Sequence, residues 1–92
     1  KTFGMFVGED KKVTTRFENS LVGPVIDRFG KEIMIIPDGD EHFKFTADVA
    51  VSPQFFAWIC GFGTQAEIIG PAEVVSEFAK HIRSIADQYP SD

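Results

Sequence analysis

The sequence has a single cysteine, Cys60, among its 92 residues. One cysteine cannot form an internal disulfide, so a disulfide-stapled framework is excluded. The sequence also lacks any apolar run near the ~20 residues that cross a bilayer, which argues against a membrane-spanning helix. Basic residues are few: nine Lys and Arg stand against 14 Asp and Glu, a formal net charge of −5. Because such a surface repels a phosphate backbone, we expect no direct binding of DNA or RNA by this chain.

Phenylalanine is abundant by contrast, with ten Phe beside one Trp and one Tyr. Apolar residues make up 43% and charged residues 25% of the chain, which is typical of a globular domain. A chain of this length forms one small domain, here with an aromatic core. Free cysteine suits a reducing compartment, so we expect a cytoplasmic location.

Periodicity divides the chain in two. Residues 1–11 carry Phe3, Met5 and Phe6 without a clear period, which predicts a connector whose apolar residues pack against something upstream. The domain itself is expected over residues 12–92. Strands are predicted at residues 12–17, 33–36, 43–51 and 66–69, with the second strand buried. A turn at residues 37–40 should join the second and third strands into a hairpin.

Three helices are predicted between and after these strands. Asn19 and Ser20 are N-cap candidates for a helix over residues 21–29, which Gly30 ends. Ser52 as N-cap and Pro53 at the first helical position start the second helix, which ends at Gly61. The third helix follows Pro71, and its apolar residues keep a 3.6-residue period as far as Tyr89.

The resulting order is strand, helix, strand, strand, helix, strand, helix. It predicts an α+β fold: a ferredoxin-like split β-α-β sandwich (βαββαβ) with an additional C-terminal helix, in which an antiparallel sheet carries helices on one face. The helix-free face should then present the polar residues of the alternating strands, among them Arg16.

No motif predicts catalysis, a cofactor or a metal. The G-x-G-x-x-A match at residues 61–66 follows a helix and precedes a strand, the reverse of a dinucleotide-binding site. The acidic turn at residues 38–42 lacks calcium-loop spacing, and His42 and His81 are far apart in sequence. Cys60 is interpreted as a small buried apolar residue. We therefore expect a protein that is not an enzyme.

Five residues are candidate interaction positions. Asp27 and Arg28 leave the apolar stripe of their helix, and either a surface pair or a contact to a neighbouring domain explains them. Trp58 also lies off its helical stripe, and either a second core contact or an aromatic anchor for a partner explains it. With Phe62 it would form an aromatic edge of the kind that interfaces use, and Arg16 is the candidate on the helix-free face.

Four segments carry a resemblance to a known family. They are FGMFVGE, VTTRFENSLVGPVIDRFGKE, HFKFTADVAVSPQFFAWICGFG and EIIGPAEVVSEFAKHIRSIADQY, of which DRFG at residues 27–30 and the run over residues 51–63 are the most specific. Together they resemble the C-terminal end of bacterial WYL-domain transcriptional regulators. In that family a winged helix-turn-helix is followed by a WYL domain and a C-terminal extension called WCX.

The resemblance implies a function for the whole chain. Residues 1–11 would be the linker from a missing upstream WYL domain, and residues 12–92 a ferredoxin-like module for effector sensing and dimerisation. Its partners would be the WYL domain of the same chain, a homodimer partner and a small-molecule or nucleotide effector, with DNA reached only through the missing helix-turn-helix. The alternative is a free-standing, ACT-like domain that binds small molecules.

Overall fold

The computed structural model describes residue 3 and residues 8–91. Its elements, in chain order, are β1 (Glu9–Glu18), a 3-10 turn η1 (Asn19–Leu21), α1 (Val22–Phe29), β2 (Ile36–Asp38), β3 (His42–Val51), α2 (Pro53–Cys60), a second 3-10 turn η2 (Gly63–Gln65), β4 (Ala66–Gly70) and α3 (Ala72–Ala86). The order of helices and strands is the predicted one. Of the helices within these residues, none combines the length and the apolar character that a bilayer crossing requires.

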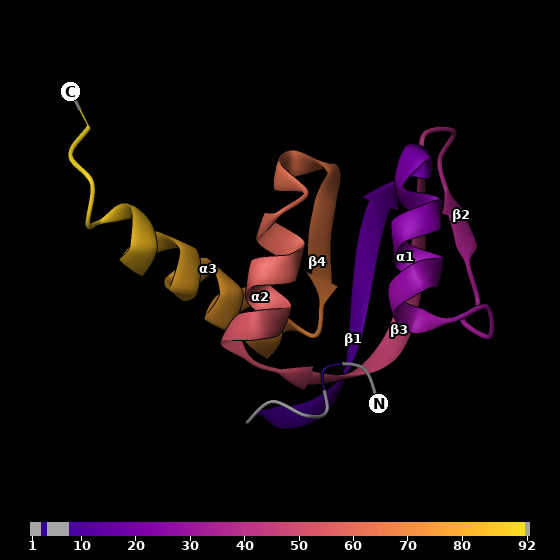
Figure 1. The fold of residues 1–92 in the computed structure, drawn as a ribbon, viewed down its shortest axis with the longest axis horizontal. Helices are drawn as coiled ribbons and strands as arrows, with labels where there is room; N and C mark the ends of the chain where they lie inside the picture. Colours follow the sequence, from indigo (N-terminus) through magenta and orange to yellow (C-terminus); the bar gives the residue numbers. More distant parts are fainter. Residues whose placement is uncertain (1–2, 4–7, 92) are drawn as a thin grey trace.

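The strands form one four-stranded sheet in the order β2-β3-β1-β4, and all three neighbouring pairs are antiparallel. β1 pairs with β3 along ten residues, from Glu9 opposite Val51 to Glu18 opposite His42. Helices α1 and α2 cover one face of the sheet, and α3 runs away from the β4 side (Figure 1). The predicted α+β fold, with an antiparallel sheet and an additional C-terminal helix, is confirmed.

The core lies between the sheet and helices α1 and α2. Its centre is phenylalanine: Phe17 of β1 is fully buried and its ring lies 6.0 Å from that of Phe43 and 5.9 Å from that of Phe45, both on β3. Phe55 of α2 and Val25 of α1 close the core from the helical side, and both are fully buried. The alternation that predicted inward-facing Val13, Thr15 and Phe17 is thus confirmed by their burial.

The first strand and the first helix differ from prediction at their ends. β1 begins at Glu9, so residues 9–11, assigned to the connector from sequence, lie in the sheet and pair with β3. Asn19 and Ser20 do not cap α1, because no side-chain cap bond is made there and the Asn19 amide nitrogen Nδ2 instead donates to the Asp40 carbonyl over 3.0 Å. Gly30 ends α1 as predicted, at φ 88°.

The prediction of a buried strand over residues 33–36 is wrong. Only Ile36–Asp38 pair with β3, and Met34 is 74% exposed. A short apolar run predicts burial only when elements cover both its faces, and β2 is an edge strand. The hairpin turn between β2 and β3 was predicted correctly.

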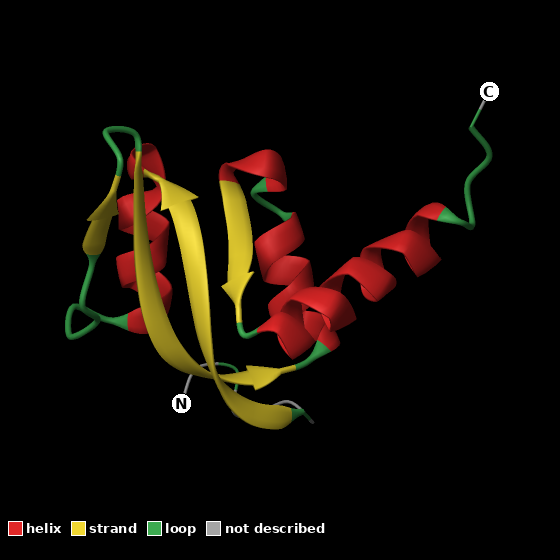
Figure 2. Cartoon of the chain, turned by 180° about the vertical axis from the view of Figure 1, so that it is seen from behind, coloured by secondary structure: helices red, strands yellow, loops and turns green. Residues whose placement is uncertain are grey.

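Helix α2 starts as predicted, since the Ser52 hydroxyl oxygen accepts a hydrogen bond from the Phe55 amide over 3.2 Å and Pro53 occupies the first turn. The apolar stripe of helix α3, by contrast, is buried only near the start of the helix. Val74 is fully buried, but Ile82, Ile85 and Tyr89 are 40%, 44% and 69% exposed. Figure 2 shows α3 extending from the β4 side of the sheet beyond the rest of the fold.

Candidate functional site

The structure brings three of the five candidate residues together. Arg28 at the end of α1 and Trp58 in α2 face each other across the helical layer, with 5.7 Å between the Arg28 guanidinium and the Trp58 ring. Phe62, just after α2, lies with its ring 5.0 Å from Trp58. Arg16 lies elsewhere: its ion pairs join β1 to the adjacent strand β4 and to β2, which lies beyond β3 in the sheet. Asp27 is exposed on α1 beside Arg28.

The residue that completes this cluster is Phe3, which no sequence pattern marked. Its ring lies 5.5 Å from Phe55 and 6.1 Å from Trp58, and the Arg28 guanidinium covers it at 4.8 Å from the ring centre. Only 8% of Phe3 is exposed. We call the three residues Arg28, Phe55 and Trp58 the Phe3 seat. The prediction that the apolar residues of the connector pack upstream is wrong for Phe3, which packs on this domain. The other two residues of that prediction, Met5 and Phe6, lie outside the described residues.

Local sequence explains how the seat is built. Phe55 and Trp58 are three residues apart in α2, so their side chains project from one side of the helix. Arg28 lies in the last turn of α1, where a cation also interacts favourably with the helix dipole. A guanidinium above an aromatic face is attracted by the ring quadrupole by ~0.5–2 kcal/mol, depending on desolvation. The seat therefore holds an aromatic side chain by both packing and electrostatics.

The backbone of the segment before β1 is constrained at Phe3 and at Gly8. Phe3 has a left-handed φ of 66°, which is uncommon for a bulky residue and costs ~1–3 kcal/mol unless the surroundings hold it. Gly8 lies so close to β3 that a Cβ there would come within 2.2 Å of the Val51 carbonyl oxygen. Only glycine fits this approach, and it fixes where the chain enters β1.

Trp58 and Phe62 belong to the core as well as to the seat. The Trp58 ring lies 5.7 Å from Phe17 and 5.5 Å from Phe29, and Phe62 lies 5.6 Å from Phe17. Of the two interpretations of Trp58, the second core contact is confirmed. A shallow depression of about 390 Å³ beside the seat is lined by Pro24, Asp27, Arg28 and Trp58.

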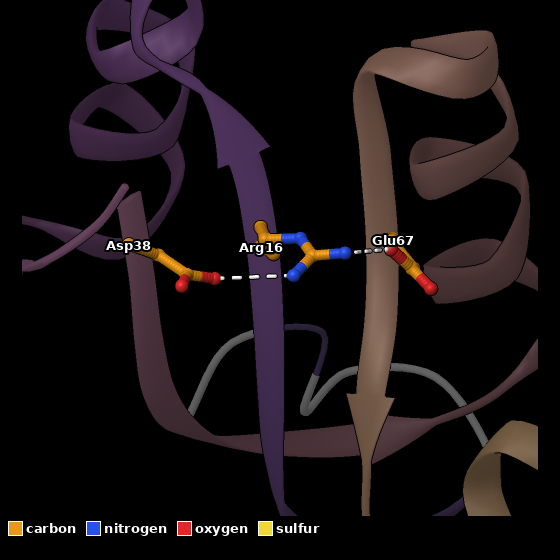
Figure 3. A network of polar contacts seen from close by, with 3 residues as sticks. All are labelled: Arg16, Asp38 and Glu67. Carbon is orange, nitrogen blue, oxygen red and sulfur yellow. Dashed lines mark hydrogen bonds and ion pairs between the residues drawn. The ribbon is translucent and has the colours of Figure 1, made fainter. Parts of the chain in front are cut away.

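Arg16 forms the centre of a second polar cluster (Figure 3). Its Nη1 donates to Asp38 Oδ2 over 3.2 Å and its Nη2 to Glu67 Oε1 over 2.7 Å. From β1, the side chain thus reaches the adjacent strand β4 on one side and, beyond β3, strand β2 on the other. The hydrogen bond to Asp38, followed by that to Glu67, raises the pKa of Arg16 above its usual value. Both carboxylates are engaged within the fold, so this cluster ties the three strands together.

The side chains that were considered for nucleophilic catalysis or metal binding lie apart from one another. Cys60 is exposed, so its interpretation as a buried residue is wrong; it falls on the outer side of α2, next to Ile59, which is buried. Within residues 8–91 no three His, Cys, Asp or Glu side chains gather closely enough to hold a metal ion. Asp38, in the acidic turn, is directed to Arg16 instead.

Sequence reasoning missed Phe3 because an isolated apolar residue in a connector has no periodicity that would assign it a face. The exposed stripe of α3 was missed for a different reason: amphipathic periodicity identifies an apolar face without identifying what covers it.

Comparison with known proteins agrees with this architecture. No curated protein matches the sequence. The family model of the WCX domain matches residues 9–86, from the first residue of β1 to the last residue of α3. This match covers every strand and helix of the described residues, and the chain is accordingly a member of the WCX domain family.

Proposed function

We propose that this WCX domain is the C-terminal regulatory and dimerisation module of a bacterial, cytoplasmic DNA-binding transcriptional regulator, and that it catalyses no reaction. Family membership and the resemblance to WYL-domain regulators support this class. In such a protein the module would follow a winged helix-turn-helix and a WYL domain. With a net charge of −5, the module leaves DNA contact to the helix-turn-helix.

The observation that carries the proposal is the seating of Phe3. A residue of the entering segment is held between α1 and α2 by Arg28, Phe55 and Trp58. A segment anchored in this way transmits the orientation of the module to whatever precedes it. A freely hinged module would have no such means of influencing its neighbour.

Regulation then follows from two arrangements of the module relative to the preceding domain. An effector, a small molecule or a nucleotide, shifts the balance only if it binds one arrangement better than the other. The WYL domain of the same chain and a second subunit are the surfaces against which the module would pack. The seat supplies a contact that differs between an anchored and a released connector.

The test is a comparison of the full-length protein that carries this domain with a form lacking residues 9–86, in gel-shift titrations with DNA from its own promoter region. We expect both forms to bind DNA and the truncated form to differ in affinity or stoichiometry. Arg28→Ala in the full-length protein should shift binding in the same direction, and Lys31→Ala, at an exposed basic residue just after α1, is its control. A full-length protein without DNA binding would refute the proposal, as would identical titrations of the two forms.

The alternative, an ACT-like domain that binds small molecules, has less support. The segment after β1 is the 3-10 turn Asn19–Leu21, which carries no glycine. A depression of about 430 Å³ between α2 and α3, lined in part by Phe56, Lys80 and His81, is the place where such a ligand would lie. A thermal-shift screen with amino acids and nucleotides tests it, because a binder raises the melting temperature in a concentration-dependent way.

A further inference from the structure

The Phe3 seat has the form of a binding site for a flat ring. Phe55 meets the Phe3 ring in an edge-to-face contact at 5.5 Å, and the Trp58 ring lies tilted at 6.1 Å. The Arg28 guanidinium lies over the same ring, 4.8 Å from its centre. Only 8% of Phe3 is exposed, so the domain encloses the position that its ring occupies. The ring of a ligand would find the same contacts there.

The Arg28 guanidinium has a hydrogen-bonding capacity that a phenylalanine ring does not satisfy. A guanidinium is attracted only weakly to the quadrupole of a ring, whereas it forms two parallel, charge-assisted hydrogen bonds to a carboxylate. Lys11 and Arg16 each pair with carboxylates, but no ion pair within the described part of the chain includes Arg28. The charge of Arg28 is therefore available to an anionic group at the seat.

The depression beside the seat gives room for such a group. Its volume is about 390 Å³, and Arg28 and Trp58 line it as well as the seat. A substituent on a ring in the seat would therefore extend into the depression and still contact Arg28. Asp27, which is exposed, also lines the depression, and its carboxylate repels further negative charge. The lining thus favours a single carboxylate over a doubly charged group such as a phosphate.

Phe3 occupies the seat in a conformation that favours its replacement. Its φ of 66° lies in the left-handed region, which is unfavourable for a bulky residue, so release of Phe3 relieves strain. Because Phe3 belongs to the same chain, its effective concentration at the seat is high, and a ligand that offered only a ring would not compete with it. A competing ligand needs the carboxylate that the Phe3 side chain lacks.

We propose that the Phe3 seat binds a small aromatic monocarboxylate, which takes the place of the Phe3 ring and pairs its carboxylate with Arg28. The inference deepens the proposed function and rests on it for one point, that this ligand acts as the effector. Because the ring position is enclosed, Phe3 and the ligand exclude each other. The ligand therefore favours the arrangement in which the segment before β1 is released.

The experiment is a titration of the 92-residue chain with benzoate at constant ionic strength, followed by the emission of Trp58, the sole tryptophan. For so small a ligand in competition with Phe3, we expect a dissociation constant on the order of 1–10 mM. Benzyl alcohol has the ring without the charge, and cyclohexanecarboxylate has the charge without the planar ring. Each should bind at least about tenfold more weakly than benzoate, because each lacks one of the two interactions of the seat.

Four variants locate the binding. Phe3→Ala should bind benzoate about tenfold more tightly than the parent chain, because it removes the competing ring. Arg28→Ala should bind benzoate no better than benzyl alcohol, and Lys31→Ala, at an exposed basic residue just after α1, is its control and should match the parent. Asp27→Asn should tighten benzoate binding about threefold, because it removes a like charge from the depression.

Equal benzoate affinities of the parent chain and of folded Phe3→Ala overturn the inference, and so does a preference for benzoate that survives Arg28→Ala or is lost in Lys31→Ala. Circular dichroism checks that each variant is folded. If Phe3→Ala fails to fold, the variants at the exposed residues Asp27 and Arg28 decide the outcome. A chain that binds none of the three ligands, but whose deletion alters DNA binding, refutes the carboxylate site alone. A chain that binds benzoate at the seat, but whose deletion leaves DNA binding unchanged, refutes the regulatory role alone.

Discussion

Thr15 is a polar residue at an apolar position of the core. It faces inward between Val13 and Phe17, is 3% exposed, and its hydroxyl has no hydrogen-bond partner within the described part of the chain. Leaving a buried hydroxyl unpaired costs ~1–3 kcal/mol. Alternation along β1 predicted that the Thr15 side chain points inward. The free-energy cost arises because no acceptor or donor lies beside its hydroxyl in the described part of the chain.

We expect Thr15→Val to raise the free energy of unfolding by about 1 kcal/mol, because valine keeps the shape and removes the unpaired group. Urea denaturation monitored by circular dichroism measures it. Thr14→Val is the control, since the Thr14 hydroxyl lies 2.7 Å from that of Thr46 on the other face and should give no gain. Equal effects of the two substitutions would contradict the prediction.

At the scale of elements, α1 depends on the glycine that follows its last residue. Gly30 has a φ of 88°, and a Cβ there would lie 3.1 Å from a carboxylate oxygen of Glu32. We expect Gly30→Ala to lower the free energy of unfolding by about 1 kcal/mol because alanine disfavours this backbone region. Gly23→Ala is the matched control: it lies inside α1 with open space around it and should stabilise by ~0.5–1 kcal/mol. A loss in both variants would show that α1 is intolerant of alanine in general.

The base of α3 is joined to β1 by an ion pair between Lys11 and Glu73. The hydrogen bond to Glu73 raises the pKa of Lys11 above 10.5. A base with a raised pKa stabilises the fold below its unfolded-state value and loses that contribution as the pH rises through its folded-state value. Glu73→Gln should therefore lower stability slightly at pH 7–9, and this difference should shrink as the pH rises through the range in which Lys11 loses its proton.

Urea midpoints measured across that pH range at low salt test the Lys11–Glu73 pair. Glu77→Gln, one turn further along α3, serves as control and should show no such convergence. High salt should shrink the effect at all pH values, since the pair is at the surface. A difference that does not shrink as the pH rises would assign it to something other than Lys11.

In this chain the sequence predicts a helix or strand correctly where the chemistry of neighbouring residues is enough to determine it. The Ser52 cap with Pro53, the Gly30 stop and the alternation of β1 each follow from the chemistry of one or two residues, and each is confirmed. The predicted burial of Ile33–Ile36 failed because burial depends on which elements cover a face. The candidate site divides in the same way: Arg28 and Trp58 were identified by leaving their helical stripes, whereas Phe3 joins them through tertiary packing.

At the scale of the whole molecule, the Phe3 seat ties the entering segment to the helical layer. We expect Phe3→Ala to lower the free energy of unfolding by about 2 kcal/mol, as buried aromatic surface is lost. The emission of Trp58, the sole tryptophan, should shift to longer wavelength because its ring gains contact with water. Fluorescence spectra and urea titrations of the same samples measure both.

Tyr89→Ala is the control for Phe3→Ala, since Tyr89 is an aromatic residue with 69% of its surface exposed. It should leave the Trp58 emission and the stability nearly unchanged. Arg28→Ala should reproduce the direction of the Phe3 effect with a smaller loss, because it removes the guanidinium and keeps the aromatic contacts. Unchanged emission in Phe3→Ala would show that the seat is empty in solution.

The geometry of α3 makes it a lever. Its first turns are fixed by Val74 and Phe78 against the body, while the remaining length extends outward. For a helix of 15 residues, ~22 Å long, a tilt of about 10° at its base sweeps the far tip through about 4 Å. A rearrangement too small to disturb the aromatic core is thereby amplified into a displacement about as large as a side chain at the tip.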